Sequence, residues 1–116
     1  PYKEALRVAL ANLKALSDGG ATIAMGTDSG PPARFHGYFE HLELELMAQA
    51  GLAPMQILVA STSDAARCIG LEEVGTLEAG KFADFVVTTA NPLEDITNTR
   101  MIESVWISGN EVPRQR

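Results

Sequence analysis

A short apolar run without polar alternation constrains the fold of this chain more than any other feature. Residues 22–25 read Thr-Ile-Ala-Met, and they follow a helical segment that stops at Asp18, Gly19 and Gly20. An apolar run of this kind is typical of a strand buried on both faces, as in a parallel sheet covered by helices. Because helix, tight turn and buried strand form half of a β/α unit, the sequence predicts an α/β fold.

Three helices are predicted, over residues 2–17, 36–50 and 54–70. The first carries an apolar stripe at helical spacing, made by Leu6, Leu10, Leu13 and Leu16. Gly51 closes the second helix, and Pro54 suits the first turn of the third. The third helix is expected to run without a break to Gly70, with Cys68 on its inward stripe as a buried structural thiol.

The sequence becomes rich in strand and turn signals after residue 70. Strands are predicted over residues 74–77, 83–88 and 104–107. Gly109-Asn110 is predicted to form a two-residue hairpin turn. The chain is therefore divided into a β/α piece, residues 1–70, and a β-rich piece, residues 71–116.

Composition excludes several classes of function. The 116 residues have a formal net charge of -6 and no run of Lys or Arg, which argues against nucleic acid as a partner. No apolar stretch is long enough to cross a membrane, and no signal peptide is recognisable. The single cysteine excludes an internal disulfide and suits a reducing compartment, so a cytoplasmic protein is expected. Helical sequence begins almost at Pro1, which suggests a piece of something longer.

Asp28 is the strongest candidate for a chemical role. It lies just beyond the carboxyl end of the predicted buried strand, where parallel α/β folds place reactive groups. A carboxylate there can bind a cation or take a proton from metal-bound water. The alternative is that Asp28 only caps a turn or a helix.

Arg34 and His36 are further candidates in the loop that follows. His36 could reach Asp28 because the loop is short, and a solvent-facing histidine at the start of a helix is the alternative. A guanidinium can form paired hydrogen bonds with a substrate carboxylate, and a surface arginine is the alternative. His36 and His41 are five residues apart, so they do not form the i, i+4 pair of a helical zinc site. The acidic residues of the second helix, Glu40, Glu43 and Glu45, are interpreted as a solvated face.

The order of several motifs resembles the C-terminal portion of the amidohydrolase superfamily, close to imidazolonepropionases and Xaa-Pro dipeptidases. The motifs are Gly26-Thr27-Asp28-Ser29-Gly30, the helix that includes His41 to Met47, the Ala60 to Arg67 helix, and Gly75 to Val87 with its Gly-Lys-x-Ala-Asp core. The resemblance covers nearly the whole chain.

The resemblance implies a hydrolase of C–N bonds other than ordinary peptide bonds, acting on a small molecule and using one or two divalent metals, with zinc expected. It implies the last units of a (β/α)₈ TIM-type barrel, with residues 71–116 completing a small β-sandwich. Asp28 would bind metal or carry a proton, and Arg34 and His36 would line the mouth of the site. Such a barrel needs about 250 residues, so the barrel is incomplete here.

The sequence is compatible with three interpretations. The chain is expected to be inactive and metal-free alone, because the superfamily's other ligands have no counterpart in it. It is interpreted first as the C-terminal part of the enzyme. The alternatives are a non-catalytic remnant or binding module, and a structural piece that completes a barrel supplied by another chain. A strand with unpaired edges favours pairing with another chain, so a homo-oligomer or a partner chain is expected.

Overall fold

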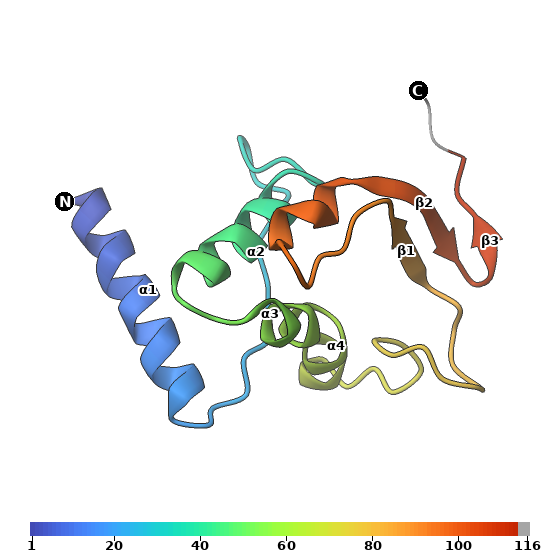
Figure 1. The fold of residues 1–116 in the computed structure, drawn as a ribbon, viewed down its shortest axis with the longest axis horizontal. Helices are drawn as coiled ribbons and strands as arrows, with labels where there is room; N and C mark the ends of the chain where they lie inside the picture. Colours follow the sequence, from blue (N-terminus) through green and yellow to red (C-terminus); the bar gives the residue numbers. More distant parts are fainter. Residues whose placement is uncertain (114–116) are drawn as a thin grey trace.

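A long first helix lies apart from a mixed helical and β-sheet body in the computed structural model, which describes residues 1–113 (Figure 1). The elements in chain order are α1 (Tyr2–Asp18), α2 (Phe39–Gln49), α3 (Pro54–Ser61), α4 (Ser63–Cys68), β1 (Phe85–Thr88), the 3-10 helix η1 (Ile96–Arg100), β2 (Ile102–Ile107) and β3 (Asn110–Glu111). The Cα radius of gyration is 15.1 Å, whereas a compact domain of this length has about 13 Å. The excess agrees with the peripheral place of α1, none of whose side chains is buried.

The buried core lies where α2, α3 and η1 meet. Met47 from α2 and Ile57 from α3 are 2% and 0% exposed, and Ile96 from η1 packs with them. Leu44, Leu52 and Ala60 complete this cluster. Each large apolar side chain buried in this way contributes about 1.5–3 kcal/mol. The core therefore joins the helical part of the chain to the segment that precedes β2.

The sheet has three antiparallel strands in the order β1-β2-β3. Val86 lies opposite Val105, and Phe85 stacks on Trp106 with 5.6 Å between ring centroids. The hairpin between β2 and β3 turns at Ser108 and Gly109, both with positive φ, which is the geometry of a type I′ turn. The turn predicted at Gly109-Asn110 is therefore wrong by one residue, because Asn110 already pairs with Ile107.

The predicted buried strand at residues 22–25 is not formed. The segment is irregular, and neither Thr22 nor Ala24 is buried. Met25 donates one backbone hydrogen bond, of 2.9 Å, to the carbonyl of Ala60. A strand needs neighbours for its N–H and C=O groups, and among residues 1–113 only β1, β2 and β3 form a sheet. In place of the expected β/α unit, the chain has a helix, an irregular segment and a helix.

The helix predicted over residues 54–70 is broken at Thr62. The hydroxyl groups of Ser61 and Thr62 donate to carbonyls one turn earlier, at Ile57 and Leu58, and such bonds bend helices. Cys68 follows the break and is exposed, so the expectation of a buried thiol is wrong.

Residues 74–76 form bends and Leu77 is irregular, so the strand predicted over residues 74–77 is not formed. Gly75 has a φ of +86° and packs directly on the start of α4. A left-handed residue in the middle of the segment is incompatible with extended strand geometry. Among residues 1–113, no helix combines the length and the apolar character that crossing a bilayer requires.

Candidate active site

The loop between α1 and α2 holds all three residues predicted for the site. We call residues 26–38 the Asp28 loop. Asp28 has a φ of +52°, a left-handed conformation that is unusual for a residue with a side chain. Its side chain is 82% exposed. Backbone strain of this kind is maintained only where surrounding contacts determine the conformation.

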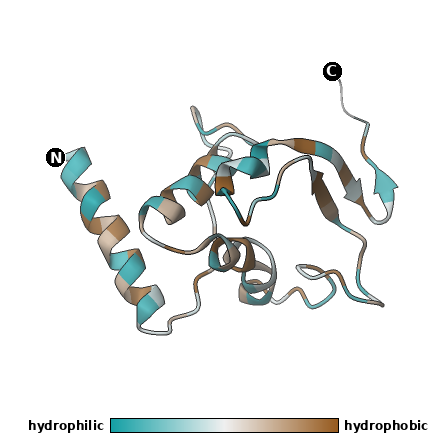
Figure 2. Cartoon of the chain, in the orientation of Figure 1, coloured by the Kyte–Doolittle hydropathy of each residue, from teal (hydrophilic) through white to brown (hydrophobic). Residues whose placement is uncertain are grey.

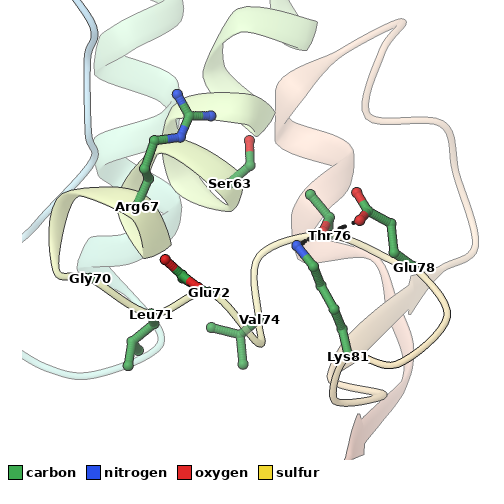
Figure 3. Close-up of a pocket in the computed structure, with 9 residues that line it drawn as sticks. All are labelled: Ser63, Arg67, Gly70, Leu71, Glu72, Val74, Thr76, Glu78 and Lys81. Atoms are coloured by element: carbon green, nitrogen blue, oxygen red, sulfur yellow. Dashed lines mark hydrogen bonds and ion pairs between the residues drawn. The ribbon is translucent and has the colours of Figure 1, made fainter.

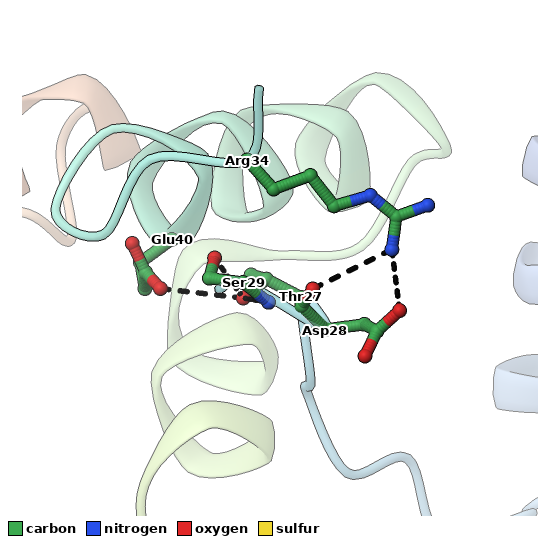
Figure 4. Close-up of polar contacts among 5 residues, drawn as sticks. All are labelled: Thr27, Asp28, Ser29, Arg34 and Glu40. Atoms are coloured by element: carbon green, nitrogen blue, oxygen red, sulfur yellow. Dashed lines mark hydrogen bonds and ion pairs between the residues drawn. The ribbon is translucent and has the colours of Figure 1, made fainter. Parts of the chain in front are cut away.

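Arg34 lies on the carboxylate of Asp28. One guanidinium nitrogen of Arg34 forms an ion pair with Oδ2 of Asp28, and the same nitrogen donates to the backbone carbonyl of Asp28 at 3.4 Å (Figure 4). Both side chains are exposed to solvent. An exposed pair of this kind contributes little to stability, so it can open when a ligand competes for either partner.

The two residues beside Asp28 face the other way, towards the first turn of α2. The hydroxyl groups of Thr27 and Ser29 lie 2.7 Å apart, and Thr27 donates to Oε1 of Glu40 at 3.3 Å (Figure 4). The other carboxylate oxygen of Glu40 accepts the Gly37 backbone N–H at 2.6 Å. Hydrogen bonds from its own backbone N–H and from the Ser29 hydroxyl lower the pKa of Glu40.

Glu40 is thus a member of the site that sequence reasoning missed. The sequence predicts a solvated acidic face made by Glu40, Glu43 and Glu45, but none of the three is fully exposed. The available signal was the position of Glu40 three residues after Gly37 at the start of a helix, which resembles the reach-back half of a capping box. Glu45 instead forms an ion pair with Arg100 of η1, with 2.7 Å between Oε1 and Nε.

His36 lies in the Asp28 loop but is not hydrogen-bonded to Asp28. A Cβ atom placed on Gly30 would be 3.8 Å from Nε2 of His36, so the imidazole lies beside the middle of the loop. His41 is separate from this site, because its Nδ1 lies 2.9 Å from the Thr99 hydroxyl. The structure therefore brings Asp28 into contact with Arg34, and it leaves the two histidines in different surroundings.

The residues present do not make a metal site by themselves. Within residues 1–113, no group of three or more His, Cys, Asp or Glu side chains could hold a metal ion together. Asp28, the predicted metal ligand, has a guanidinium on its carboxylate. A divalent cation in proteins needs several donors around it, and the Asp28 loop has two side chains of a ligating type, Asp28 and His36.

A hollow separate from the Asp28 loop lies between α4 and residues 70–81 (Figure 3). Its volume is about 380 Å³, and its charged lining comes from Arg67, Glu72, Glu78 and Lys81. Lys81 donates to the Thr76 hydroxyl at 2.7 Å and lies 3.7 Å from Glu78, while Arg67 pairs with Asp64. Because its cations already have acidic partners, this hollow does not select an anionic ligand.

A wider and mostly apolar groove lies between α3 and the sheet. It has a volume of about 900 Å³ and is lined by Leu58, Leu77, Phe85, Val105 and Trp106 among others. His41 and Asp84 are its titratable lining residues within the part of the chain that the structure describes. The groove is distinct from the Asp28 loop, which contributes no residue to its lining.

Comparison with models of protein families identifies the family of this chain. The model of the amidohydrolase family matches residues 4–112, which is nearly the whole chain. The chain belongs to the amidohydrolase family. The resemblance inferred from the motifs is therefore confirmed.

The chain covers a quarter of the length of each of three amidohydrolases that it resembles. The imidazolonepropionase of Deinococcus deserti is 34% identical over 101 residues, which cover 84% of this chain and 25% of that protein. Among solved structures, molinate hydrolase gives a TM-score of 0.80 at 27% identity, covering 87% of this chain and 25% of that one. A Xaa-Pro dipeptidase gives 0.80 at 28% identity, covering 89% and 25%. The chain thus corresponds to part of a larger fold.

Proposed function

We propose that this chain is the C-terminal part of a metal-dependent amidohydrolase that cleaves C–N bonds outside ordinary peptide links. Such bonds include cyclic amides, amidines and dipeptide-like amides. The observation that carries the proposal is the conformation of Asp28. In a chain of this family, it presents an exposed carboxylate on strained backbone, in a loop held to the next helix. The rest of a (β/α)₈ barrel would provide the remaining ligands of the bound metal, which we propose is zinc.

In this proposal Asp28 handles the proton of the reaction. Its carboxylate accepts a proton from the attacking water while the new C–O bond forms. It then returns that proton to the leaving nitrogen as the C–N bond breaks. Arg34 would leave Asp28 and bind a substrate carboxylate, because a guanidinium forms paired hydrogen bonds with that group. His36 would line the same mouth.

The apolar surface of the chain supports assembly with the remainder of a longer polypeptide. Leu6 and Leu16 of α1 are 45% and 56% exposed, and Figure 2 shows hydrophobic residues along α1 outside the packed body. We propose that the remaining three quarters of a family-length protein cover this helix and the groove beside the sheet. We choose this occupant over a second copy because the chain covers only 25% of the Deinococcus deserti imidazolonepropionase and 25% of molinate hydrolase.

A second candidate is a non-catalytic remnant or a piece that only completes another chain's barrel. The incomplete donor set among residues 1–113 favours it. Both candidates are tested by expressing the chain alone and within its full-length gene product, with zinc supplied. Metal content and hydrolysis of a panel of Xaa-Pro dipeptides, N-acyl amino acids and cyclic amides are then measured. Stoichiometric zinc with turnover in the full-length protein supports the enzyme. Zinc-free protein without turnover of any panel member contradicts it.

A further inference from the structure

Glu40 connects the two ends of the Asp28 loop. Its carboxylate accepts the Gly37 N–H with one oxygen and the Thr27 hydroxyl, 13 residues earlier, with the other. Thr27 in turn accepts the Ser29 N–H at 3.3 Å. These bonds fix the residues on both sides of Asp28 to the first turn of α2.

The contacts act on opposite sides of the backbone. Figure 4 shows Thr27 and Ser29 directed towards Glu40, while the carboxylate of Asp28 points away from Glu40 and towards Arg34. Asp28 adopts a left-handed φ of +52° in this arrangement, a conformation that residues with a side chain adopt uncommonly. The bonds to Glu40 join this part of the loop to a helix.

We propose that Glu40 is a positioning residue that holds the backbone at Asp28 so that its carboxylate faces the substrate side of the loop. This proposal rests on the catalytic role proposed for Asp28. Glu40 itself touches no reacting atom in this account. Its two oxygens instead set the direction in which Asp28 points.

A simple helix-capping role is the competing explanation, and the structure separates the two. Capping involves the bond from Gly37 to Glu40, whereas positioning also requires the bond from Thr27. Thr27→Val removes the hydroxyl and preserves the β-branched shape, and it leaves the Gly37 bond in place. Glu45→Gln is the matched control, because Glu45 lies on the same helix and pairs with Arg100 instead.

The test uses the full-length protein with zinc and a substrate that it hydrolyses. We expect Glu40→Gln and Thr27→Val to lower kcat about 10–100-fold, since a displacement of the order of 1 Å has that effect. KM should change less than twofold, and Glu45→Gln should keep kcat within twofold of wild type. Exchange of the Ser29 amide proton, measured by NMR or mass spectrometry, should accelerate at least tenfold in Glu40→Gln and in Thr27→Val but not in Glu45→Gln.

Asp28→Asn distinguishes failure of this proposal from failure of the proposed function. If Asp28→Asn is inactive while Glu40→Gln and Thr27→Val keep wild-type kcat or wild-type Ser29 exchange, the positioning role is overturned and the role of Asp28 stands. A lower melting temperature without loss of kcat also overturns it, since capping alone explains that result. Wild-type kcat in Asp28→Asn overturns both.

Discussion

His41 on α2 donates a hydrogen bond from Nδ1 to the Thr99 hydroxyl in η1, at 2.9 Å. The direction follows from Thr99, whose one hydroxyl proton is donated to the carbonyl of Ile96 at 2.9 Å. Since Ile96 belongs to the buried core, this chain of two bonds joins helix α2 to the segment that leads into the sheet.

Burial of the His41 side chain predicts a loss of stability at mildly acidic pH. Burial of the ring, and secondarily the charge of Arg100, lower the pKa of His41, while Glu40 and Glu45 oppose this shift. The folded state then binds fewer protons than the unfolded state, so the free energy of unfolding falls as pH drops below about 6.5. Because the side chain of His41 is only partly buried, the effect should stay below about 1 kcal/mol.

Urea unfolding at pH 7 and pH 5 measures this difference. His41→Asn should reduce the loss of stability between the two pH values, and His36→Asn, at an exposed side chain, is the matched control. An equal loss in wild type and His41→Asn would show that His41 does not contribute.

Gly75 should tolerate no side chain. A Cβ atom there would lie 2.7 Å from Cβ of Ala66 and 2.9 Å from the carbonyl oxygen of Thr62, at a φ of +86°. The conformational strain of about 1–2 kcal/mol adds to an overpacking cost of about 1–3 kcal/mol. We expect Gly75→Ala to lower the free energy of unfolding by about 3 kcal/mol, measured by denaturant titration.

Gly80→Ala is the control for the strain alone. Gly80 has a φ of +91°, but no atom lies within 4 Å of a Cβ placed there. Its substitution should therefore cost about 1–2 kcal/mol. Equal losses for the two glycines would mean that the contact between Gly75 and the start of α4 is not tight.

The exposed face of α1 should make the isolated chain self-associate. Apolar area that the rest of a longer protein would cover remains in water in this chain, and association buries it at about 25 cal/mol per Å². Light scattering at micromolar concentration should give a mass above that of a monomer. Leu6→Glu should shift the population towards monomer, and Ala11→Glu, which adds the same charge at another exposed position of α1, should not. A compact monomer in wild type would contradict this expectation.

Local signals predicted the helices well, and the strands less well. The leucine spacing of α1, Gly51 after α2 and Pro54 at the start of α3 are all encoded within a few residues. Residues 22–25 have the composition of a buried strand, but a strand depends on partners distant in sequence, and β1 to β3 pack elsewhere. Residues 22–25 therefore have the composition of a strand, but within residues 1–113 they have no neighbouring strand with which to form a sheet.

The site was predictable in part for a similar reason. Asp28, Arg34 and His36 were identified from their place after the residue 22–25 segment, and the pairing of Asp28 with Arg34 needed the fold of the loop. The sequence does not reveal the contact between Glu40 and Thr27, because these two residues lie at opposite ends of the Asp28 loop. Helical periodicity reports which face a residue occupies, and it does not report which loop crosses that face.

We propose that Asp28 is the catalytic carboxylate of an amidohydrolase that the rest of a longer polypeptide would complete. The most direct test is kcat of Asp28→Asn in the zinc-loaded full-length protein. Asp18→Asn is the control, since Asp18 is also an exposed carboxylate paired with a cation, Lys14. We predict that Asp28→Asn lowers kcat at least about 100-fold, the lower range for loss of a general acid–base group, while Asp18→Asn leaves it unchanged. Wild-type kcat in a correctly folded Asp28→Asn protein would contradict the account.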